Sequence, residues 1–204
     1  MTDTLTIDEL VDTRAAFLKK AAIFGGGVVA AASGAMALPS SALSSTASDI
    51  AILNFALTLE YLEATFYTIA EHKAPLKGEA KKFARIVGSH ERAHVTALMQ
   101  TIAKLGGTPV KKPLFDFRSA WRSESAFLAT AMALEDTGVS AYNGAGPALT
   151  LTPVKAAAAS IVAVEAQHAS WAHRLNGLSG APLAFDIPKN KAEVLAAAGP
   201  FIRG

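Results

Sequence analysis

The chain has 204 residues, of which 51% are hydrophobic and only 7% are aromatic. That length suits one well-buried domain with extensions, and many alanines with few aromatic side chains favour packed helices over a strand-rich sandwich. Lys and Arg total 19 against 17 for Asp and Glu, so no large positive field attracts nucleic acid or acidic lipids. Because the chain contains no cysteine, disulfides, thiolate zinc sites and iron–sulfur clusters are excluded, and any metal must bind through nitrogen and oxygen.

Residues 1–37 have the pattern of an export signal. A long polar leader with basic residues precedes a Gly/Ala-rich run over 21–37 that ends in a small-x-small sequence. The stretch around Arg14 resembles a twin-arginine (Tat) signal, although Ala15 stands where the second arginine is expected. The alternative is a buried or membrane-anchoring helix over 21–37, which its length and its glycines disfavour. We therefore expect an exported protein, periplasmic or extracellular, without a transmembrane domain after signal removal.

The rest of the chain predicts four long helices. Residues 38–48 are rich in Ser and Pro and predict a flexible linker, and Asp49 is the expected N-cap of the first helix. Hydrophobic periodicity and stop signals at Gly and Pro place the helices at 49–72, 78–105, 119–142 or 123–142, and 153–178. The sequence therefore predicts an all-α four-helix bundle over residues 49–180.

Two further segments complete the predicted architecture. The connection 106–118 is longer than the other two and contains Pro109 and Pro113, which favour an extended crossover along the bundle between the second and third helices. The C-terminal tail, 181–204, predicts a short helix near 191–198 and a terminal contact by Pro200-Phe201-Ile202. We expect this tail to pack on the bundle.

Each predicted helix carries a glutamate on the apolar stripe that should face the core. In the first helix, Glu60 shares its stripe with Leu53 and Leu57, which step by three and four residues. In the second and fourth helices a histidine follows the glutamate after three residues, which places both side chains on one helix face. The six polar residues on these stripes are Glu60, Glu91, His94, Glu135, Glu165 and His168.

Four buried carboxylates need a compensating charge, because a lone ionised carboxylate is very unfavourable in an apolar interior. Two divalent cations would balance four carboxylates, and neutral imidazoles add no charge. The pattern also repeats, since Glu60 precedes Glu91 by 31 residues and Glu135 precedes Glu165 by 30. The sequence therefore predicts a two-metal site. The alternatives are a buried polar network without metal and an accident of sequence.

Other polar residues near these stripes are weaker candidates. Glu63 lies one turn beyond Glu60 and could be an extra ligand or line the route of a metal, but a solvated or hydrogen-bonded acid is favoured. Tyr67 and Tyr142 each follow a stripe glutamate by seven residues and are candidates to lie beside the ligands. The remaining histidines and the tryptophans are interpreted as surface, hydrogen-bonded or packing residues: His72, His90, His173, Trp121 and Trp171.

At these motifs the chain resembles the ferritin-like domain family, in particular the branch that includes plant desiccation-related proteins and exported bacterial proteins. The resembling stretches are 53–63, His90-Glu91-Arg92-Ala93-His94, 133–135, 164–168 and the tail from 185 to 202. A Glu from each of two helices plus Glu-x-x-His from each of the other two is the ligand pattern of ferritin-like carboxylate proteins. The resemblance implies that the six stripe residues hold two iron ions, with manganese as a variant, and it is compatible with a homo-oligomer.

The leading hypothesis for function is a redox-active di-iron protein that reacts with oxygen or peroxide, similar to an oxidase or ferroxidase. Glu91 and Glu165 are the expected bridging ligands, with Glu60 and Glu135 terminal. The main alternative is an exported stress or desiccation-related protein that binds metal without turnover. A third reading is a degenerate bundle that contacts another protein. No catalytic residue beyond the ligands follows from the sequence.

Overall fold

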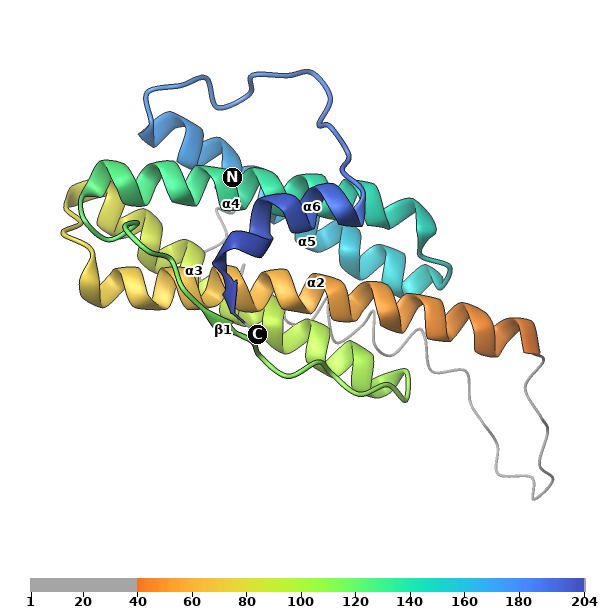
Figure 1. The fold of residues 1–204 in the computed structure, drawn as a ribbon. Helices are drawn as coiled ribbons and strands as arrows, with labels where there is room; N and C mark the ends of the chain where they lie inside the picture. Colours follow the sequence, from red (N-terminus) through yellow and green to blue (C-terminus); the bar gives the residue numbers. More distant parts are fainter. Residues whose placement is uncertain (1–39, 204) are drawn as a thin grey trace, which may run out of the picture.

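Four long helices form a bundle in the computed structural model, which describes residues 40–203 (Figure 1). They are α2 (Ser40–Lys73), α3 (Gly78–Lys104), α4 (Glu124–Ala145) and α5 (Thr152–Leu175). Helix α2 packs mainly against α3, and α4 mainly against α5, so the bundle consists of two helix hairpins side by side. The predicted all-α four-helix bundle is therefore confirmed. The predicted export signal lies outside the described residues.

The first helix begins earlier than the sequence suggested. Helix α2 starts at Ser40, inside the predicted linker 38–48, because neither Gly nor Pro occurs between Ser40 and Lys73 to end it. Asp49 is therefore not its N-cap. Instead, the buried Asp49 carboxylate accepts hydrogen bonds from the backbone N–H groups of Thr150 (2.8 Å) and Leu151 (2.9 Å), immediately before α5. It stabilises the positive end of a different helix.

The long connection between α3 and α4 crosses the bundle and is fastened by the C-terminus. Within it, β1 (Leu114–Phe115) pairs antiparallel with β2 (Ile202–Arg203). Phe117 is buried between Phe66 of α2 and Phe201, with ring centroids 5.3 and 5.8 Å away, respectively. Figure 1 shows this crossover passing over α2 beside the C-terminus. The predicted crossover and the predicted terminal contact are both present.

The tail packs on the bundle only in its last part. Helix α5 ends at Leu175, before the predicted end at 178. Two residues later Gly177 takes a φ of 75°, which is typical of a glycine that ends a helix. The following segment arches away from the bundle (Figure 1) and exposes Leu183, Phe185 and Ile187. The chain then returns as α6 (Lys191–Ala198), which packs against α4. The prediction that the whole tail packs on the bundle is therefore wrong for the arch.

Two apolar layers divide the core along the helix axes. One is aromatic and contains Phe66, Phe83 and Phe127. The other is aliphatic and contains Leu57 and Ile102. In α2, α3 and α5 the buried glutamates lie close to the boundary between these layers in the sequence, in the middle of the bundle. Among residues 40–203, no helix has an apolar stretch long enough to cross a membrane.

Candidate metal centre

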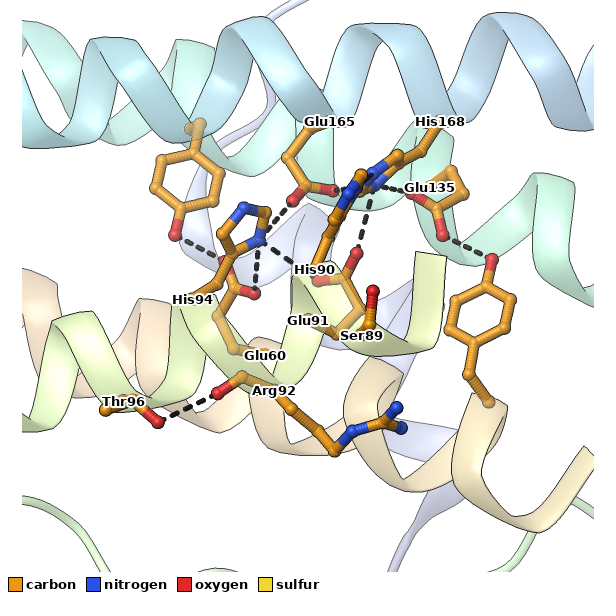
Figure 2. A network of polar contacts seen from close by, with 12 residues as sticks. Glu60, Ser89, His90, Glu91, Arg92, His94, Thr96, Glu135, Glu165 and His168 are labelled. Atoms are coloured by element: carbon orange, nitrogen blue, oxygen red, sulfur yellow. Dashed lines mark hydrogen bonds and ion pairs between the residues drawn. The ribbon is translucent and has the colours of Figure 1, made fainter. Parts of the chain in front are cut away.

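The structure brings all six stripe residues together at the centre of the bundle. Helix α2 contributes Glu60, α4 contributes Glu135, and α3 and α5 each contribute a Glu-x-x-His pair, so their side chains converge in Figure 2. The four glutamates are no more than 1% exposed. The most exposed side chain of the six is that of His94, at 11%.

The first group of ligand atoms surrounds Nδ1 of His94. This nitrogen lies 3.2 Å from Oε2 of Glu60, 3.2 Å from Oε2 of Glu91 and 2.9 Å from Oε1 of Glu165. One ligand atom from each of these four residues lies within 4.8 Å of the others. Three carboxylates and one imidazole therefore face a single point.

The second group surrounds Nδ1 of His168. This nitrogen lies 3.0 Å from Oε1 of Glu91, 3.3 Å from Oε2 of Glu135 and 3.8 Å from Oε2 of Glu165. These four residues satisfy the same 4.8 Å criterion. The second group thus repeats the composition of the first.

Glu91 and Glu165 belong to both groups, and each divides its two oxygens between them. Glu91 directs Oε2 towards His94 and Oε1 towards His168. Glu165 directs Oε1 towards His94 and Oε2 towards His168. Glu60 and Glu135 each join only one group. Two carboxylates are therefore shared between the groups, and each group has one carboxylate and one imidazole of its own.

Several atoms of the cluster have no hydrogen-bond partner, which tests whether it suits a cation. Among the described residues, these buried atoms are Oε2 of Glu60, Oε1 of Glu91, Oε2 of Glu135, both carboxylate oxygens of Glu165 and Nδ1 of His168. Buried polar atoms are normally paired, and atoms left unpaired need an explanation such as a bound ion. Carboxylate oxygens with imidazole nitrogens suit iron and manganese. The cluster therefore fits a metal site.

The electrostatics of the cluster point the same way. Burial raises the pKa of Glu91 well above its ordinary value, and the nearby Glu165 adds to this effect. Burial likewise raises the pKa of Glu135 to about 7. Burial also acts to raise the pKa of Glu165, but the adjacent imidazoles of His168 and His94 outweigh burial and lower that pKa to about 2. Cations would take over the compensation that protons otherwise provide.

Two tyrosines hold the terminal carboxylates from the opposite hairpin. Tyr142 of α4 donates a hydrogen bond to Oε1 of Glu60 at 2.5 Å. Tyr67 of α2 donates one to Oε1 of Glu135. Each tyrosine thereby leaves Oε2 of its glutamate facing the cluster. Burial raises the pKa of both phenols, so they remain protonated donors. The repeat in the sequence had indicated these tyrosines, but not that each crosses to the other half.

Glu63 is a fifth buried carboxylate, only 3% exposed. The sequence-based preference for a solvated or hydrogen-bonded acid is wrong about solvation. A Cβ added to Gly138 would lie 3.1 Å from Oε1 of Glu63 and 3.4 Å from Oε2 of Glu165, so both carboxylates border the space beside this glycine. Burial, followed by the charge of Glu165, raises the pKa of Glu63 well above its ordinary value. Glu63 does not belong to either ligand group.

The remaining histidines differ from one another. His90 was interpreted as a surface or hydrogen-bonded residue, and its Nδ1 in fact lies 2.8 Å from Nε2 of His168. His173 lies 2.9 Å from Oδ1 of Asp136, which fits the prediction of a hydrogen-bonded histidine. His72 is exposed, as predicted. Trp121 and Trp171 pack against the aromatic layer, also as predicted.

A helical bundle with a central carboxylate–histidine cluster defines a class of proteins able to bind metal between their helices. The family model of the ferritin-like domain matches residues 48–178, and the chain belongs to this family. No curated protein matches the chain. The match applies to the family as a whole, so membership in the desiccation-related branch stays a prediction.

Proposed function

We propose that this protein holds two iron ions in the central cluster and uses them in redox reactions with oxygen or peroxide, as an oxidase or ferroxidase-like protein. The observation that carries the proposal is the division of the oxygens of Glu91 and Glu165 between two ligand groups. A single cation would need only one group. Two groups that share two carboxylates are the arrangement expected for a pair of ions.

The two positions would have equivalent ligands. Glu60 and His94 would complete the first position, and Glu135 and His168 the second, with Glu91 and Glu165 serving both. Two iron ions bound together can supply two electrons to oxygen or peroxide, and carboxylates favour the more highly charged oxidised form. Manganese is a variant, because oxygen and nitrogen ligands do not separate the two metals.

The protein would support this chemistry by excluding water from the cluster and by fixing the orientation of the ligands. The apolar layers on both sides of the cluster limit access of water. Tyr67 and Tyr142 fix the terminal glutamates through hydrogen bonds, which orients their second oxygens before a metal arrives. Metal binding must displace the protons that the raised pKa values of Glu91 and Glu135 retain.

Anaerobic loading with Fe(II), followed by oxygen, tests the proposal. The wild type should take up two equivalents of iron, consume oxygen and develop a ferric absorption band. The double variant Glu91→Ala, Glu165→Ala should lose the band, and circular dichroism checks that it keeps the helicity of the wild type. His72→Ala, on the exposed end of α2, serves as a control that should behave as the wild type. Absence of oxygen consumption by the iron-loaded wild type would refute redox function.

The alternative function is an exported stress or desiccation-related protein that binds metal without turnover. It is supported by the burial of five glutamates, because neutralising them would couple metal binding strongly to stability. A large rise in melting temperature with metal, but no oxygen consumption, would favour this function over the first.

Export is supported by the leader over residues 1–37. Expression of the full chain in a bacterial host, fractionation and N-terminal sequencing would test it. The expected mature protein begins after residue 37, and full-length protein in the cytoplasm alone would contradict export.

A further inference from the structure

His168 makes contacts through both ring nitrogens. Its Nδ1 faces the carboxylates of Glu91 and Glu135. Its Nε2 lies 2.8 Å from Nδ1 of His90, a partly exposed residue of α3 (Figure 2). One side of this imidazole therefore belongs to the metal cluster and the other to a second histidine.

The contact between the two rings is a hydrogen bond in the plane of both imidazoles. The rings are inclined by 20°, and their centroids are 5.1 Å apart. The radii of two imidazoles account for the difference between this distance and the 2.8 Å that separates the nitrogens. The two nitrogens thus lie close to the line that joins the ring centres. N–H bonds and lone pairs of imidazole lie in the ring plane, which makes this the favourable direction for a hydrogen bond.

The direction of this hydrogen bond follows from the chemistry of a ligand histidine. A neutral imidazole has one N–H donor and one lone pair, and the nitrogen that binds a cation must offer its lone pair. When Nδ1 of His168 offers its lone pair to a cation in the cluster, Nε2 would carry the proton and donate a hydrogen bond to Nδ1 of His90. We propose that His90 is a positioning residue that fixes the tautomer and the ring orientation of His168. The inference rests on the proposed metal binding.

The internal repeat makes this support specific to one half. His90 immediately precedes Glu91, and the residue that immediately precedes Glu165 is Val164. A valine side chain cannot accept a hydrogen bond. The second half of the repeat therefore offers no equivalent acceptor at this position for His94. His90 distinguishes the His168 position from its neighbour.

Two substitutions distinguish the hydrogen-bond acceptor of His90 from the space that its ring fills. His90→Phe keeps an aromatic ring but has no acceptor, whereas His90→Asn can place its amide oxygen where Nδ1 stands, with the same number of bonds from the backbone. His72→Phe, at an exposed position, is the matched control. The probe is Co(II), whose affinity is measured by competition with a chelator. Its paramagnetism also shifts the N–H proton signals of ligand imidazoles.

His90→Phe should lower the affinity for one of the two Co(II) ions by about 10- to 100-fold, which is the usual effect of removing a hydrogen-bond partner of a ligand histidine. It should also remove the slowly exchanging ring N–H signal of His168. His90→Asn should restore both properties, and helicity should be unchanged in every variant. Unchanged affinity and signals in His90→Phe, or equal defects in both variants, would overturn the role of His90 but leave the proposed metal binding intact. Failure of the wild type to bind Co(II) would overturn both this inference and the proposed metal binding.

Discussion

Gly138 leaves room for two carboxylates, so Gly138→Ala should disturb the metal site without unfolding the protein. This glycine lies inside α4, and an added Cβ would lie 3.1 Å from Oε1 of Glu63 and 3.4 Å from Oε2 of Glu165. The first distance is tighter than ordinary contact, so Glu63 must move by a few tenths of an ångström. In metal-free protein, the flexible end of Glu63 can make that movement. With metal bound, Glu165 is held in place and the space is fixed.

The substitution Gly138→Ala should affect stability in opposite directions in the metal-free and the metal-bound protein. Alanine is favoured over glycine inside a helix by about 0.5–1 kcal/mol, so the metal-free variant should be at least as stable as the wild type. Displaced carboxylates should weaken metal binding by about tenfold, at the lower end of the effects seen when ligand orientation is disturbed. A tenfold loss corresponds to about 1.4 kcal/mol. For a chain of this size, the metal-induced rise in Tm should therefore shrink by about 3–6 °C.

The assay is thermal unfolding with a chelator and with saturating Mn(II), which avoids oxidation. Gly146→Ala is the matched control, because Gly146 caps the same helix with a φ of −52° and its added Cβ would meet nothing within 4 Å. It should preserve the full metal-induced rise. If Gly138→Ala shows the same rise as Gly146→Ala and the wild type, Glu63 and Glu165 are not confined as described, and the reasoning fails.

Three further predictions concern the pH dependence of stability, the tyrosines and Asp49. Burial raises the pKa of Glu135 from 4.5 to about 7, so the folded state retains a proton that the unfolded chain loses across this range. The Tm of metal-free protein should therefore fall as pH rises from about 4.5 to about 7, whereas Mn(II)-loaded protein should gain stability; parallel curves in thermal melts would contradict this. Glu165, with its pKa lowered to about 2, loses its contribution only below that range. Tyr67→Phe and Tyr142→Phe should each weaken Mn(II) binding by about tenfold in calorimetric titrations, because each leaves a terminal carboxylate unheld; wild-type affinity in both would exclude that role. Asp49→Ala should lower the free energy of unfolding by about 1–2 kcal/mol in urea titrations, because it removes the cap at the start of α5. It should not change Mn(II) affinity, because Asp49 lies far from the cluster along α2; a loss of affinity would contradict this separation.

The sequence contained enough information for the six residues of the cluster, because helical periodicity sets which residues share a face. Glu60 and Glu135 interrupt apolar stripes, and the Glu-x-x-His spacing places two ligands on one face whatever the tertiary structure. The same logic identified Tyr67 and Tyr142 as neighbours of the site. Local spacing was therefore sufficient wherever one helix determines the outcome.

Sequence reasoning failed where the outcome depends on two elements distant in the chain. The burial of Glu63 depends on the space beside Gly138, which lies on another helix. His90 lies about 100° around α3 from Glu91, and only the packing of α3 against α5 turns it towards His168. Asp49 looked like a local cap because its chemistry suits one, but it caps α5 instead. In each case the residue type indicated the kind of interaction, but the sequence did not indicate which residue would be the partner.

The two halves of the repeat give the cluster nearly equivalent positions, and the departures from equivalence fall on the same side. The equivalent of Glu63 in the second half is Gly138, and the equivalent of His90 is Val164. His90 contacts His168, and Glu63 borders the space beside Oε2 of Glu165, the oxygen that faces His168. The His168 position therefore has an additional buried acid and an additional hydrogen-bonded histidine nearby. A pair of identical metals in this site would occupy two different environments, so the two positions would bind metal with different affinities.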